Sequence, residues 1–178
     1  GEWFYNKTNH QLYLYAPGGV NPNTINVEAV TKLNGFNLDI HVSYLTIQDL
    51  KISGYKETGV DGYTCNNNTV QRCNISKIER YGIRLNGQDN LIYDNHIEDV
   101  LNDGVNGVFT RGELKRNIIK RTGLIAGYGE DGYGCYAILI WNAMNTIIEN
   151  NIIDSTGYVG IFASNSVKVR KNVISYSL

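Results

Sequence analysis

A six-residue pattern of apolar and polar positions recurs along this chain. Each copy begins and ends with an aliphatic residue and holds mainly polar residues, often Asn, between them. The six copies are Ile47–Ile52, Val70–Ile75, Ile92–Ile97, Leu114–Ile119, Ile148–Ile153 and Val169–Ile174. Their first residues lie 23, 22, 22, 34 and 21 positions apart. A period in this range predicts a solenoid, in which each repeat buries its apolar side by stacking on its neighbours.

A second set of positions has the same period. In each repeat a small residue comes before a short run in which apolar and polar residues alternate. These runs are Gly62–Cys65, Gly82–Leu85, Gly107–Thr110, Ala137–Ile140 and Gly160–Ala163. Together the two sets predict two short strands per repeat, separated by corners rich in Gly, Asn and Asp.

The repeats lack the Leu-x-x-Leu-x-Leu frame of leucine-rich repeats and the 3.6-residue period of helical repeats. The 19 Gly and two Pro suit tight corners rather than helices. The pattern therefore predicts an all-β fold, a parallel β-helix of about six coils.

One polar column is predicted to be structural. Equivalent side chains of successive coils lie about 4.8 Å apart, so an inward Asn can hydrogen-bond to the next Asn and to corner backbone. The column contains Asn95, Asn117, Asn151 and Asn172, with Leu50 and Cys73 at its first two positions. We expect a ladder of amides here rather than catalysis.

The repeated phrase, followed by Gly-Ile, resembles the repeat of right-handed parallel β-helix proteins of the pectin-lyase-like superfamily, over roughly residues 41–178. The opening Gly1–Asn6 and then Leu12–Tyr15 resemble the hairpin that often precedes the helix in secreted bacterial members. The resemblance implies a right-handed helix over 41–178, preceded by a hairpin and lead-in strand over 1–40. It also implies a secreted or cell-surface protein. The superfamily includes polysaccharide lyases, glycosidases, epimerases and members without assigned activity, so the reaction is less defined than the fold.

The composition limits the classes of binding partner. The chain is 42% hydrophobic and 19% charged, which fits one globular domain with a short leading segment. No run approaches the roughly 20 apolar residues of a membrane span, and the net charge of −1 argues against nonspecific nucleic-acid binding. We expect that an export segment has been removed and that further coils, or some other cover, follow the uncapped last coil.

The three cysteines do not match a metal site, because no CxxC pair or Cys/His cluster with zinc spacing is present. Cys65 and Cys73 fall at inward positions and are predicted to fill the core. Cys135 lies in an insertion.

That insertion, at about 123–135, explains the one interval of 34 residues. Loops inserted into a solenoid often form its binding face, or they cover apolar outward residues. The match of Gly127–Gly132 to GxGxxG is dismissed, because no βαβ unit surrounds it. Glu130 and Asp131 are candidate calcium ligands, although the calcium-binding nonapeptide they resemble normally recurs in successive repeats.

Outward positions supply candidate substrate-binding residues. We predict that Phe109, Trp141 and Phe162 form an exposed aromatic patch that stacks on sugar rings. Arg84 and Arg111 would hold a carboxylate or sulfate on the same face. The alternatives are that the insertion packs over this patch as a second core, or that a protein partner does.

Each candidate catalytic residue could also have a purely structural role. Asp61 and Asp103 lie two coils apart, about 9.6 Å, near the wide limit for an inverting glycosidase. Asp-Gly is also common corner chemistry, which we favour. His96 and Lys120 supply the base and cation that a uronate lyase needs, although a surface role suits His96 better.

The sequence thus supports two functional hypotheses. The first is a secreted protein that binds or processes a polysaccharide, as a lyase or glycosidase would. The alternative is a non-enzymatic surface, adhesion or filament module that self-associates through its coil ends.

Overall fold

The computed structural model describes residues 2–21, 24–26, 30–38, 40–125 and 135–177. It divides the chain into two compact units, Gly1–Val30 and Thr31–Leu178. In the first unit, β1 (Glu2–Asn6) and β2 (Gln11–Tyr15) pair antiparallel, and a short 3-10 helix, η1 (Pro17–Gly19), follows. The hairpin expected at the start of the chain is therefore confirmed.

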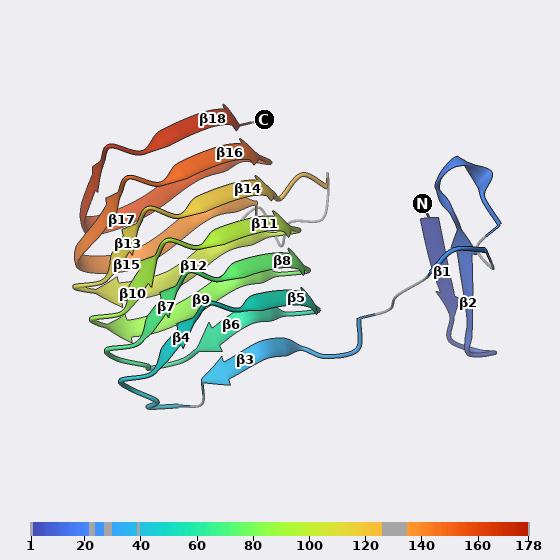
Figure 1. Ribbon diagram of the computed structural model, residues 1–178, viewed down its shortest axis with the longest axis horizontal. Helices are drawn as coiled ribbons and strands as arrows, with labels where there is room; N and C mark the ends of the chain where they lie inside the picture. The colour runs from blue at the N-terminus through green and yellow to red at the C-terminus, as the bar shows by residue number, and fades with distance from the viewer. Residues whose placement is uncertain (1, 22–23, 27–29, 39, 126–134, 178) are drawn as a thin grey trace. The chain divides into compact units, whose positions relative to one another are not determined.

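The second unit is a solenoid of six coils with three faces, and all its strands pair in parallel. The first face contains β3 (Asn34–Leu38), β6 (Thr58–Gly62), β9 (Tyr81–Gln88), β12 (Asp103–Thr110) and the starts of β15 (Tyr136–Glu149) and β17 (Val159–Arg170). The second face contains β4 (Thr46–Gln48), β7 (Thr69–Gln71), β10 (Leu91–Tyr93), β13 (Glu113–Lys115) and the ends of β15 and β17. The third face contains β5 (Lys51–Tyr55), β8 (Asn74–Ile78), β11 (His96–Val100), β14 (Ile118–Thr122), β16 (Ile152–Thr156) and β18 (Val173–Ser177). Figure 1 shows the third-face strands stacked in chain order, which confirms the predicted parallel β-helix.

Each coil has strand residues on three faces rather than on the two predicted, although in the last two coils one strand, β15 or β17, spans the first and second faces. The repeated six-residue phrase contains a corner, so its first aliphatic residue lies on the second face and its last on the third. The residue at the third position of each phrase turns the chain with a φ between 50° and 59°. Non-glycine residues adopt this left-handed conformation only where the surrounding structure imposes it. The pattern of apolar residues alone did not reveal this corner.

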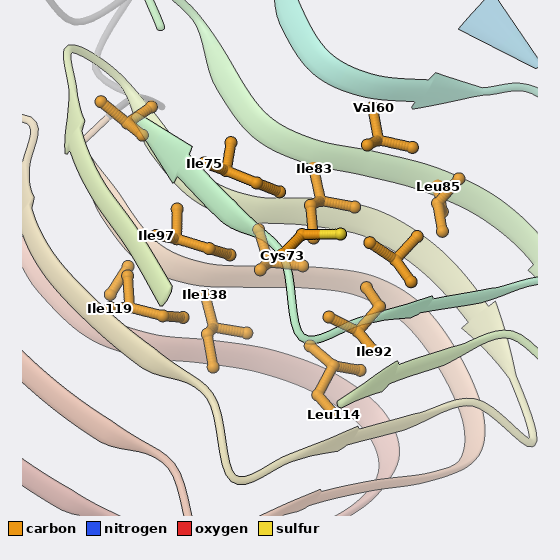
Figure 2. Packing of buried hydrophobic residues seen from close by; sticks show 14 of the residues in the cluster. Val60, Cys73, Ile75, Ile83, Leu85, Ile92, Ile97, Leu114, Ile119 and Ile138 are labelled. Carbon is orange, nitrogen blue, oxygen red and sulfur yellow. The ribbon is translucent and has the colours of Figure 1, made fainter. Parts of the chain in front are cut away.

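Stacked aliphatic side chains fill the interior. Ile75, Ile97 and Ile119 of the third face are fully buried and lie one above another, as Figure 2 shows. Cys65 and Cys73 are 0% and 2% exposed, so their predicted core-filling role is confirmed. Burial raises the pKa of the Cys73 thiol.

A column of small residues lets the first face approach the third. A Cβ added at Gly82 would lie 2.5 Å from the Gly104 oxygen and 2.7 Å from Cγ2 of Ile97. The aligned residues are Gly59, Gly82, Gly104, Ala137 and Gly160. Two members of the predicted column, Gly62 and Gly107, therefore lie three residues too far along the chain. This offset matters for the outward residues described below.

The predicted amide ladder is present. Nδ2 of Asn95 donates to Oδ1 of Asn117 at 3.0 Å, Asn117 donates likewise to Asn151 at 3.0 Å, and Asn151 to Asn172 at 2.9 Å. Each Oδ1 also accepts the backbone N–H of the equivalent residue on the preceding coil, including that of Cys73 at 3.0 Å. These bonds satisfy corner backbone that cannot reach solvent.

A second, shorter ladder was not predicted from the sequence. Oδ1 of Asn90 accepts the backbone N–H of Asn68 at 3.0 Å, and Oδ1 of Asn68 accepts that of Leu45 at 2.9 Å. Both Asn residues stand two positions before the first aliphatic residue of a phrase. That shared spacing was the available signal.

Candidate binding surface on the first face

The register of the first face aligns one outward side chain from each coil. These residues, called here the outer row, are Asn37, Asp61, Arg84, Asn106, Leu139 and Phe162. Their chain neighbours, such as Val60 and Ile83, belong to the core. Because successive side chains of a strand point to opposite sides, the outer row points away from the core. Leu139 is nevertheless only 2% exposed.

At one end of the outer row, Arg84 and Asp61 form a two-pronged ion pair. Nε and one terminal nitrogen of Arg84 donate to the two Asp61 oxygens at 2.7 and 2.8 Å. The side chains are only 25% and 13% exposed, and the Arg84 guanidinium lies 5.2 Å from the centre of the Tyr81 ring. The hydrogen bond to Asp61 raises the pKa of Arg84. The two predicted site residues therefore hold each other in place.

Asp61 and Asp103 do not face each other as a catalytic pair. Asp103 aligns with Tyr81, whereas Asp61 aligns with Arg84, three positions further along β9. Asp103 is 1% exposed, and its oxygens accept the Tyr136 backbone N–H at 3.0 Å and the Asn106 amide at 2.7 Å. Both aspartates also lie in strands rather than turns. The predicted pairing and the corner role are therefore both wrong, because the coil register differs from the one assumed.

At the other end of the outer row lie four aromatic residues, Tyr136, Trp141, Tyr158 and Phe162, called here the aromatic group. The Trp141 and Phe162 rings lie 4.7 Å apart at 49°. Tyr136 meets Phe162 and Tyr158 edge-on, at 5.9 and 5.7 Å. Trp141 and Phe162 are partly exposed and Tyr158 is 59% exposed. The predicted outward placement of Trp141 and Phe162 is confirmed.

Tyr136 and Tyr158 were not predicted from the sequence as binding residues. Each stands one or two residues before the small-residue column, in Tyr136-Ala137 and Tyr158-Val159-Gly160. That position was available as a signal, but only the structure shows that Tyr136 meets Phe162 and that Tyr158 meets Tyr136.

The predicted exposure of Phe109 is wrong. Phe109 aligns with Gly87 rather than with Arg84, as a consequence of the offset in the glycine column. Its ring turns into the core, where it is 0% exposed. A Cβ on Gly107 or Gly112 would lie 2.6 Å from this ring, so the two glycines make room for it. Phe109 therefore contributes to stability and not to the outer surface.

Arg111 lies at the next corner, away from the outer row. Its guanidinium donates to the Asp89 oxygens at 2.8 and 2.6 Å and to Gln88 at 2.9 Å. Arg84 and Arg111 thus each hold a carboxylate of this chain. They do not form the shared anion site that the sequence suggested.

His96 and Lys120 lie on the third face, separate from the outer row. As predicted, His96 aligns with Asn74 and Ile118, and Glu98 aligns with Lys120. One Glu98 oxygen lies 3.2 Å from Nε2 of His96 and 2.8 Å from Arg121. The structure therefore places a carboxylate beside His96 but does not bring His96 to Asp61.

The candidate calcium ligands Glu130 and Asp131 lie outside the described residues. Within the part of the chain that is described, no three or more His, Cys, Asp or Glu side chains gather as metal ligands would. The described helical segments also include none with the length and apolar character of a membrane span.

Comparison with known proteins agrees with the fold. A search of the curated proteins found no match, and neither did a search of the solved structures. The model of the family described as "Right handed beta helix region" matches residues 5–137, about three quarters of the chain. With six parallel coils, an amide ladder and a stacked aliphatic core, the chain belongs to the right-handed β-helix family.

Proposed function

We propose that this chain is a secreted or cell-surface polysaccharide-binding β-helix protein, with the aromatic group and the outer row as its binding surface. The observation that carries the proposal is the contact between Trp141 and Phe162 on neighbouring coils, 4.7 Å between ring centres, at a partly exposed position. Aromatic rings present large, rigid apolar faces, and Trp and Tyr dominate the energy of many binding surfaces.

Polar groups continue the surface along the stack. Along the outer row, Leu139 follows Phe162. Asn106, Arg84 and Asp61 then follow in that order. Because coils lie about 4.8 Å apart, Asn106, Arg84 and Asp61 present hydrogen-bonding groups at regular intervals beyond the buried Leu139. An extended, hydroxyl-rich chain lying along the coil axis fits a surface with stacking rings at one end and fixed polar groups further on.

The geometry supports binding better than bond cleavage. A general acid requires a carboxyl whose pKa is raised toward neutrality. Hydrogen bonds from arginine instead lower the pKa of Asp49, Asp89, Asp94, Asp99 and Glu149. Asp61 and Asp103 are engaged by Arg84, Asn106 and backbone. Lyase or glycosidase activity remains the less favoured form of the proposal.

The test is a glycan array probed with the wild type and with Trp141→Ala. We expect the substitution to weaken binding at least about tenfold, roughly 1.4 kcal/mol, because it removes the stacking face. Tyr44→Ala is the matched control, because Tyr44 is 82% exposed and belongs to the first coil. It should bind as the wild type does.

A wild type that binds no glycan contradicts the proposal. If that protein instead associates with rising concentration in light scattering, the surface-module alternative replaces it.

A further inference from the structure

A polar hollow lies on the outside of the corner where β15 and β17 pass from the first face to the second. Asn145, Ile147, Asn165, Ser166, Val167 and Lys168 line it. Its volume is about 230 Å³. Pockets for drug-sized ligands usually start at about 300 Å³. The hollow therefore suits one small unit of a ligand.

Unequal corner lengths explain why the hollow forms. Ile138 aligns with Ile161 and Ile148 aligns with Val169, so β15 advances ten residues where β17 advances only eight. The pairing shifts register between Ile140 and Ala143 and again before Thr146. Such bulges re-aim side chains and are common beside functional sites. The longer corner of β15 lies beside the shorter corner of β17, and the difference in length leaves the hollow between them.

The chemistry of the lining is hydroxyl- and amide-rich with one cation. The Ser166 hydroxyl donates to the Asn145 amide oxygen at 3.3 Å, and Asn145, Asn165, Ser166 and Lys168 are all exposed. Ile147 and Val167, which complete the lining, are partly buried. No carboxylate among the described residues lies within ion-pair distance of Lys168. The ammonium group is thus available to a ligand.

We propose that this hollow is a subsite for a sugar unit that bears an anionic group. The amides and the hydroxyl bind the sugar hydroxyls, and Lys168 binds the carboxylate or sulfate. The inference rests on the proposed function, because Trp141 directly precedes Asn142 on the same strand, and Asn165 donates to the Asn142 amide oxygen at 3.3 Å. A polysaccharide stacked on the aromatic group therefore reaches the hollow around one corner.

The experiment uses an array that pairs acidic polysaccharides with their neutral counterparts. Polygalacturonate, alginate and hyaluronan are printed beside their carboxyl-reduced forms, and carrageenan beside its desulfated form. We expect the wild type to prefer at least one acidic member of a pair by about fivefold, because a charged hydrogen bond exceeds a neutral one. The pair that shows the preference distinguishes carboxylate from sulfate.

Variants assign that preference to the hollow. Lys168→Gln should abolish the preference by lowering the binding of the acidic forms to that of their neutral counterparts. Lys51→Gln, which removes the same charge from the exposed face of the first coil, should retain it. Trp141→Ala should weaken acidic and neutral forms alike.

Two results would overturn the subsite while leaving polysaccharide binding intact: equal wild-type binding to both members of every pair, or a Lys168→Gln variant that keeps the preference. A wild type that binds no glycan on the array overturns both proposals.

Discussion

Arginine–aspartate ion pairs join neighbouring coils, and these pairs are either exposed or partly buried. At the corner between the second and third faces, Arg116 donates to Asp94 at 2.7 Å, with side chains 52% and 38% exposed. The Arg84–Asp61 pair has the same geometry, but its side chains are only 25% and 13% exposed. Exposed pairs contribute little, because water solvates both partners in the absence of the contact. A partly buried pair costs more to break, because the remaining charge lacks that solvation.

The first prediction compares the two pairs. Arg84→Met should lower the free energy of unfolding by about 1–3 kcal/mol, because it leaves the Asp61 carboxylate without its partner. Arg116→Met should cost less than about 1 kcal/mol. Urea denaturation of the two variants measures the difference. Equal losses would show that burial of the Arg84 pair has no energetic consequence.

The corner residues also show how side chains and backbone act together. Asp49, Arg72, Asp94 and Arg116 stand at the same corner of successive coils, all with positive φ. Arg72 pairs with Asp49 and Arg116 with Asp94, so charge alternates along this part of the column. Opposite charges on adjacent coils offset part of the cost of the left-handed conformation.

At the scale of the element, the amide ladder joins the coils from inside. Nδ2 of Asn117 donates to the Ile92 carbonyl at 2.9 Å and to Asn151, while its Oδ1 accepts two N–H groups of Asn95. Asn117 is 1% exposed. All four hydrogen bonds are thus made where water cannot replace them.

The second prediction follows from that burial. Asn117→Ala should lower the free energy of unfolding by about 2–4 kcal/mol, because it leaves buried N–H and C=O groups without partners. Asn74→Ala, at an exposed position of β8, should change it by less than about 0.5 kcal/mol. Urea unfolding followed by circular dichroism gives both values. A loss at Asn117 no larger than that at Asn74 would contradict the structural role of the ladder.

For the whole molecule, the charged pairs imply a pH dependence. Hydrogen bonds from arginine lower the pKa of Asp49, Asp89, Asp94, Asp99 and Glu149 in the folded chain. A lowered folded pKa means that the unfolded chain binds protons more readily. These groups therefore stabilise the fold above the unfolded pKa, about 4, and this contribution is lost as pH falls through the folded values.

The third prediction is that the melting temperature changes little between pH 7 and about pH 5 and falls below about pH 4. Thermal unfolding across this range, followed by circular dichroism, tests it. The fall should be shallower in an Arg116→Met variant, in which Asp94 titrates more nearly as in the unfolded chain. A wild type that gains stability on acidification would contradict the assignment.

Periodicity was sufficient to predict the solenoid, the number of coils and the Asn95–Asn172 ladder. Each depends on equivalent residues recurring at nearly constant spacing, and the stack then buries them together. It was not sufficient for the three-sided cross-section, because three of the six residues at the position of Asp49 are Arg or Lys, which give no sign of a corner with positive φ.

The sequence alone thus determined that apolar and Asn columns lie inside a parallel stack, since stacking the repeats buries all six phrases together. Only the tertiary structure decided which outward side chains are neighbours. Corner lengths vary from coil to coil, as between Ile138–Ile148 and Ile161–Val169, and a shift of three residues moves Phe109 from the surface to the core. Pairing between coils, and not spacing along the chain, brings Asp61 to Arg84 and Trp141 to Phe162, because register is set by backbone hydrogen bonds and core packing across coils.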